Sequence, residues 1–197
     1  MRSRFRLISL VLAAIPIYLL IPGCNPIHNV GDPNKPLPEY HPDRPFLFIL
    51  TTSGYPGPGQ RMISGVIVAI YPDGRVIRAT SESTIGESYI RGRLSPEHLA
   101  QARRILHDSG LLSTKPGGSL VVDAAAEHVG VRYGKRVISW AHSPGFESTN
   151  NASNTSSRIT RLKKELLALP LEDPKPEPPQ EWSRWPTEFY EGDPSNF

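Results

Sequence analysis

The side chains best suited to chemistry in this 197-residue chain gather in one segment of the sequence. Asp123, Glu127, His128, His142 and Ser143 all belong to the stretch from "LVVDAAAEHVGV" to "SWAHSPG". A carboxylate beside an imidazole can act as a general acid–base pair, and converging histidines can bind zinc. Either chemistry requires that the side chains share one face of the element that carries them.

The segment is typical of a β-hairpin, because β-branched runs flank Gly134-Lys135. With these two residues as the turn, the strand pairing places Glu127 opposite His142. His128 then lies on the other face, which argues against a joint zinc site and predicts no bound metal. We interpret Glu127 and His142 as an ion pair that caps the buried face. His128 is predicted to be solvated, and Ser143 is predicted to be a loop residue outside any nucleophile motif.

Further strands and two helices must position this hairpin. Apolar runs predict strands from Phe46 onward and on either side of the Pro72-Asp73-Gly74 turn. Ser95-Pro96 and Gly110 are typical of a helix start and stop, and apolar spacing predicts a second helix over 155–169. The sequence therefore predicts an α+β fold, a mainly antiparallel sheet of about five to seven strands with two helices on one face.

Proline content divides the chain into four segments. We predict a signal peptide over residues 1–23, a lipidated cysteine and proline-rich tether over 24–45, and an α+β domain over 46–169. Residues 170–197 form an acidic, aromatic, proline-rich tail. With one cysteine in the chain, internal disulfides are excluded and the domain must rest on an apolar core.

The net charge of +3 lies entirely in Arg2, Arg4 and Arg6. A basic patch for nucleic acid is therefore not indicated, and we expect no nucleic-acid partner. The domain carries an excess of basic residues, however, and the tail an excess of acidic ones. The tail either is disordered or packs its aromatic residues on the domain, and both alternatives remain open. We assign four aromatic residues as candidates for partner binding: Trp182, Trp185, Phe189 and Tyr190.

The single cysteine, Cys24, follows a basic start and an apolar run over residues 7–21 that is too short to span a bilayer comfortably. The pattern Ile21-Pro22-Gly23-Cys24 resembles a bacterial lipobox, in which the cysteine is lipidated and becomes the new N-terminus. Pro22 departs from the usual alanine or serine. The resemblance implies a protein anchored in the bacterial cell envelope by lipid, and Asn25 in place of aspartate favours the outer membrane in a Gram-negative cell.

The domain is similar to emfourin-like inhibitors of thermolysin-type proteases. The similarity rests on a strand that ends in Thr-Ser-Gly-Tyr, a helix that opens with "LSPEHL", an Asp-Ala at Asp123 and a final hairpin with helix. It covers residues 46–169 and implies no particular inhibitory contact residue. The resemblance implies a small inhibitor domain that acts on a metalloprotease.

These features favour a lipid-anchored envelope protein whose domain is a binding or structural module and not an enzyme. We expect no cofactor, and partners that include the membrane and an envelope protein or a protease. Inhibition of a secreted metalloprotease is the first alternative. A hydrolase that uses Glu127 and His142 is the second alternative.

Overall fold

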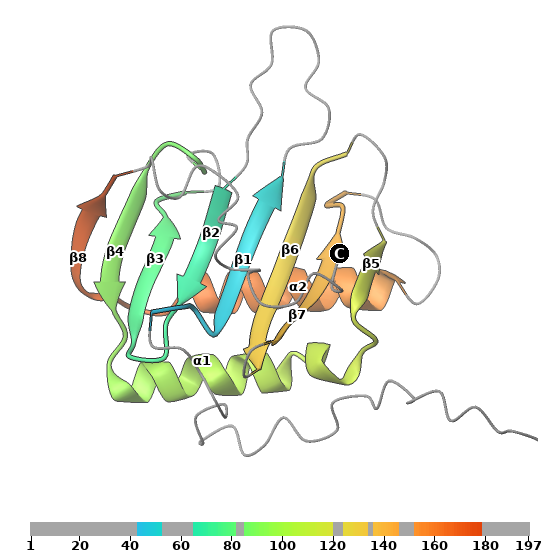
Figure 1. Ribbon diagram of the computed structural model, residues 1–197, viewed down its shortest axis with the longest axis horizontal. Helices are drawn as coiled ribbons and strands as arrows, with labels where there is room; N and C mark the ends of the chain where they lie inside the picture. The colour runs from blue at the N-terminus through green and yellow to red at the C-terminus, as the bar shows by residue number, and fades with distance from the viewer. Residues whose placement is uncertain are drawn as a thin grey trace, which may run out of the picture.

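The computed structural model describes residues 43–52, 65–81, 85–119, 124–133, 136–145 and 152–178 (Figure 1). They form eight strands, two α-helices and one short 3-10 helix. In chain order the elements are β1 (Leu47–Thr52), β2 (Gly65–Ile70), β3 (Arg75–Ala79), β4 (Tyr89–Arg93), α1 (Pro96–Asp108), η2 (Leu111–Ser113), β5 (Gly117–Ser119), β6 (Ala126–Tyr133), β7 (Arg136–His142), α2 (Ala152–Leu167) and β8 (Glu172–Glu177).

All eight strands belong to one mixed sheet, with the order β5-β7-β6-β1-β2-β3-β4-β8. Every neighbouring pair is antiparallel except β5 and β7, which run parallel. The α+β class is confirmed and the sheet is mainly antiparallel, as predicted, while the expected strand number of about five to seven is slightly too low. The two edge strands account for the difference, because β5 is the short sequence Gly-Gly-Ser and β8 is proline-rich.

β8 lies in the segment that we assigned to the tail. Its sequence, Glu-Asp-Pro-Lys-Pro-Glu, has no apolar alternation, and Pro174 and Pro176 cannot donate backbone hydrogen bonds. Proline is tolerated in a sheet only where the missing donor faces away from the neighbouring strand, as at an edge. The same prolines hinder the addition of a further strand outside β8.

Helix α1 begins and ends near the predicted residues. The Ser95 hydroxyl accepts a hydrogen bond from the backbone N–H of His98 at 3.2 Å, and Pro96 occupies the first turn. Gly110 adopts φ = 68°, a left-handed conformation that favours glycine after a helix. Arg103 of this helix is half-buried, with its guanidinium 5.6 Å from the ring centre of Phe46.

Both helices cross the same face of the sheet, which we call the helix-covered face (Figure 1). Helix α1 leads from β4 near one edge to β5 at the other, and α2 leads back from β7 to β8. Ile159, Leu162 and Leu166 form the buried stripe of α2. Arg158 and Arg161 donate hydrogen bonds to backbone carbonyls of Gly110 and Asp108, at the C-terminal end of α1. The second helix is thereby joined to the first as well as to the sheet.

The sheet is also buried on its other side, which we call the opposite face. Strand pairing places five large or apolar residues there, all of them buried: Phe48, Leu50, Ala69, Ile77 and Tyr89. Gly130 lies beneath the Phe48 ring, so that a Cβ at this glycine would come within 2.0 Å of the ring. β2 is buried on both sides, as is typical of a strand in the interior of a sheet.

Candidate functional site

The predicted register of the β6–β7 hairpin is confirmed, and Glu127 lies opposite His142. The two side chains are in contact, with His142 Nε2 3.1 Å from Glu127 Oε2. Glu127 is 7% exposed and His142 is 4% exposed. A charged group so well covered is stable only with close partners.

Helix α2 supplies two further partners, and we call the four residues together the Glu127 cluster. Lys163 donates from Nζ to Glu127 Oε1 at 2.7 Å, and Ser156 Oγ lies 2.9 Å from His142 Nδ1. Ser156 and Lys163 are two helical turns apart, so they project from the same side of α2. Neither residue is recognisable from sequence, because a serine and a lysine on a helix with a polar side resemble ordinary solvated residues.

The partners of Glu127 keep it ionised. Burial by itself would raise the pKa of this carboxyl, but the hydrogen bonds from His142 and Lys163, together with their charges, lower the pKa below its ordinary value. An ionised Glu127 can only accept, so the Nε2–H of His142 donates to it. Both carboxylate oxygens of Glu127 are therefore used within the fold.

The Glu127 cluster contains the three groups of a hydrolytic triad. The hydroxyl of Ser156 lies within hydrogen-bonding distance of the imidazole of His142, which in turn contacts the carboxylate of Glu127. Two features oppose that role. The imidazole that would act as the base has a side chain only 5% exposed, and Lys163 shares the carboxylate that would stabilise its charged form. The arrangement is better suited to fixing α2 on the sheet than to meeting a substrate.

The remaining candidates of the hairpin do not join this cluster. His128 lies on the opposite face, as predicted, but it is half-buried, so the expectation of a solvated histidine is wrong. Burial first, and the charge of His142 second, lower the pKa of His128. Ser143 follows β7 and is buried, while Asp123 lies outside the described residues. Within the part of the chain that the structure describes, no group of three or more His, Cys, Asp or Glu side chains is placed to hold a metal ion.

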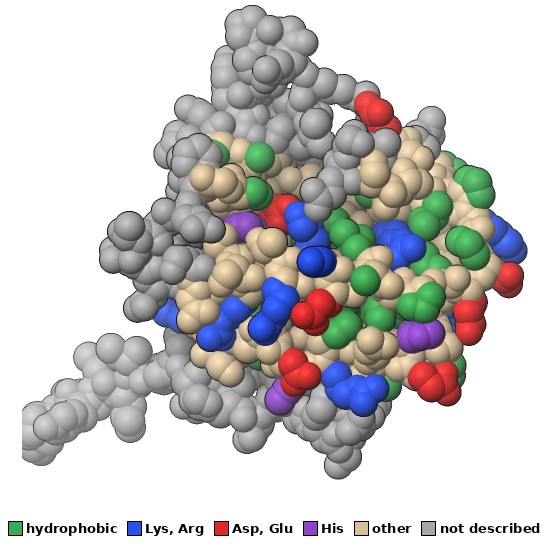
Figure 2. Space-filling view, turned by 180° about the vertical axis from the view of Figure 1, so that it is seen from behind, with side chains coloured by type: hydrophobic (Ala, Val, Ile, Leu, Met, Phe, Trp, Pro, Cys, Tyr) green, Lys and Arg blue, Asp and Glu red, His purple; other side chains and the backbone are tan. Residues whose placement is uncertain are grey.

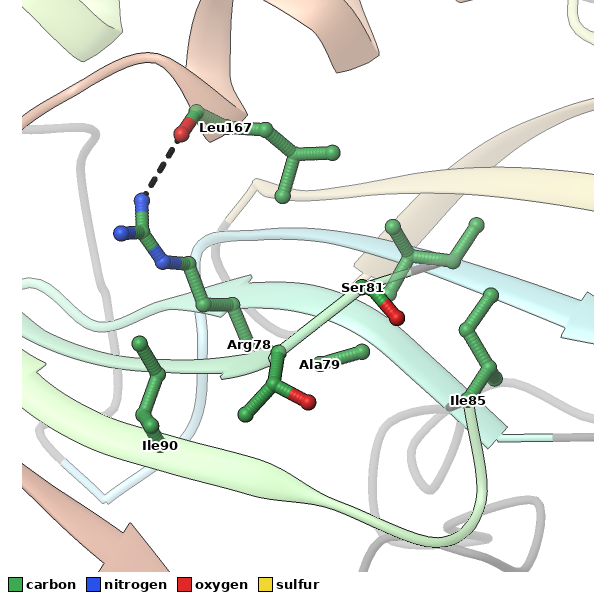
Figure 3. A pocket seen from close by; sticks show the side chains of 8 residues that line it. Arg78, Ala79, Ser81, Ile85, Ile90 and Leu167 are labelled. Atoms are coloured by element: carbon green, nitrogen blue, oxygen red, sulfur yellow. Dashed lines mark hydrogen bonds between the residues drawn. The ribbon is translucent and has the colours of Figure 1, made fainter. Parts of the chain in front are cut away.

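A pocket lies beside the C-terminal end of α2 (Figure 3). Its volume is about 160 Å³, and its walls combine apolar residues such as Ile85, Ile90 and Leu167 with Arg78. The guanidinium of Arg78 donates to the backbone carbonyls of Leu167 at 2.8 Å and Leu169 at 3.0 Å. Arg78 thus caps the end of α2, where unpaired carbonyls and the helix dipole favour a cation.

Charged and apolar side chains are interspersed on the helix-covered side of the molecule (Figure 2). Neither helix among the described residues is long and apolar enough to span a membrane. Cys24 and the four tail aromatics, Trp182, Trp185, Phe189 and Tyr190, lie outside the described residues. Comparison with family models and with curated proteins finds no match for this chain.

Proposed function

We propose that this protein is a lipid-anchored cell-envelope protein whose α+β domain binds a protein partner and performs no catalysis. The observation that carries the proposal is the Glu127 cluster, in which the catalytic-type side chains satisfy one another inside the fold. The pocket beside Arg78 is small for a metabolite, since its volume of about 160 Å³ is below the roughly 300 to 1,000 Å³ of ordinary ligand pockets.

The anchor is proposed to be lipid on Cys24. Acyl chains contribute about 0.8 kcal/mol per buried methylene, so several chains hold a protein on a membrane without a spanning helix. In a bacterial host, the wild-type chain should incorporate a palmitate analogue and sediment with membranes, and Cys24→Ser should do neither. Equal labelling of the two proteins would contradict the anchor.

The binding role is tested by cross-linking in intact envelopes. If the domain is a binding module, we expect one discrete cross-linked species. Its amount should reach a plateau as expression of this protein rises, because the supply of the partner is limited. Turnover of ester or peptide substrates that is lost in His142→Gln and kept in Ser139→Ala, a nearby substitution on the opposite face, would contradict the proposal and favour the hydrolase.

A second candidate is inhibition of a secreted metalloprotease. The element order on which the resemblance to emfourin-like inhibitors depends is present, with β1 before α1 and the β6–β7 hairpin before α2. The purified protein should then reduce the activity of a thermolysin-type protease in proportion to its concentration. Full protease activity at a large excess of the protein would remove this candidate.

A further inference from the structure

The opposite face of the sheet is covered, although neither α1 nor α2 lies over it (Figure 1). Phe48, Leu50 and Ala69 are each 0% exposed, and Ile77 is 5% exposed. Strands of the same sheet cannot bury this face, because they lie beside one another and not above one another. Apolar side chains on such a face require a further layer of chain to exclude water.

The end of β8 brings the tail to this face. Glu177 pairs with Tyr89 across the β4–β8 ladder, which places its side chain on the opposite face. There the carboxylate forms an ion pair with Arg91, 3.3 Å away. The side chain of Glu177 is only 9% exposed, although it belongs to an edge strand. The chain that follows therefore starts beside the opposite face, next to a carboxylate that is already covered.

We propose that residues 179–197 pack across the opposite face as an intramolecular layer. An extended segment of this length reaches roughly 60 Å, at about 3.3 Å per residue. Eight strands at about 4.8 Å spacing span roughly 34 Å, so the segment is long enough to cross the whole sheet. Its aromatic side chains supply the apolar surface that the face requires: Trp182, Trp185, Phe189 and Tyr190.

Charge complementarity supports the same occupant. Strand pairing places several arginines on the opposite face, among them Arg75, Arg91 and Arg93. Residues 179–197 carry four carboxylates and a single arginine. Opposite charges steer the segment to the face, and the buried aromatic rings hold it there, since screened surface pairs contribute little by themselves.

Tryptophan fluorescence of the full chain tests the proposal. Trp140 is the one tryptophan of the described residues, and its indole N–H makes no hydrogen bond, so Trp140→Phe removes its emission without breaking one. The emission of this variant then comes from Trp182 and Trp185. We expect a blue-shifted spectrum and acrylamide quenching several-fold weaker than that of a synthetic peptide of residues 179–197. Emission and quenching equal to those of the peptide would overturn the proposal.

A charge reversal identifies the surface. In the Trp140→Phe background, Arg91→Glu should increase quenching toward the peptide value, because it replaces the partner of Glu177 with a like charge. Lys164→Glu is the matched control, because it reverses the charge of an exposed residue of α2, and it should leave quenching unchanged. Equal effects of the two reversals would overturn the assignment to the opposite face.

Sedimentation over a range of concentrations separates packing within one chain from packing between copies. The proposal predicts that protection of the tail tryptophans persists in the monomer at the lowest concentration. Protection that appears only with a dimer would contradict the intramolecular layer.

Discussion

The two faces of the sheet are both buried, yet they are stabilised by different kinds of contact. On the helix-covered face, apolar residues of α2 pack beside the Glu127 cluster, whose hydrogen bonds join α2 to the hairpin. On the opposite face, contact is apolar and close, as where the Phe48 ring lies on Gly130. The position of α2 therefore depends on directional polar contacts, while packing on the opposite face depends on the complementary shapes of apolar groups.

The largest effect should come from breaking the Glu127 cluster. Lys163→Met leaves the carboxylate of Glu127 buried with one partner fewer, and loss of one member of a buried charge pair costs about 3 to 5 kcal/mol. Urea unfolding of the variant measures this loss. Lys164→Met changes the adjacent exposed lysine and should alter the free energy of unfolding by less than about 0.5 kcal/mol. Similar losses in the two variants would show that Lys163 is not a buried partner.

A smaller loss is expected from overpacking the opposite face. Gly130→Ala introduces a methyl group within 2.0 Å of the Phe48 ring, and overpacking of this kind costs about 1 to 3 kcal/mol. Adding Phe48→Leu should recover part of the loss, because the smaller side chain leaves room for the methyl group. If the two substitutions destabilise the protein additively, the contact between the ring and Gly130 is not the cause.

Contacts within one element or one hairpin could be predicted from sequence, whereas contacts between distant elements could not. Repeated apolar spacing predicted the helix stripe, and two-residue turn chemistry predicted the register that pairs Glu127 with His142. Ser156 and Lys163 join that pair only because α2 crosses β7, and the direction of a helix across a sheet is a tertiary property that local spacing does not encode. β8 was missed for a similar reason, since edge pairing with β4 overrides the weak strand tendency of a proline-rich sequence.

The hydroxyl of Ser156 should contribute less than the amino group of Lys163. Ser156→Ala removes a neutral partner from the buried Nδ1 of His142, with an expected loss of about 1 kcal/mol. Ser157→Ala is the matched control, because this exposed neighbour bonds only to the local backbone carbonyl of Asn154. Thermal unfolding compares the two variants. Loss of a hydrolytic activity in Ser156→Ala at unchanged stability would instead favour the triad role.

The smallest effect should be the pH dependence contributed by His128. Its pKa is lowered in the folded state, so the unfolded state binds the proton more readily. The contribution of His128 to the free energy of unfolding is therefore fully present above about pH 6.5. It is lost as the pH falls through the pKa of His128 in the folded state. His128→Gln should therefore flatten the decline in melting temperature just below this pH. Parallel curves for the two proteins down to the range where carboxylates titrate, about pH 4.3, would contradict a lowered pKa of the half-buried His128.

The interaction between Glu127 and Lys163 is the contact that most directly holds α2 on the sheet. A double-mutant cycle with Glu127→Gln and Lys163→Met measures that interaction directly, because each substitution keeps the size of the side chain and removes its charge. We expect a coupling free energy of at least about 2 kcal/mol, toward the upper end of the range for residues in contact. A coupling near zero, with losses that simply add, would contradict the claim.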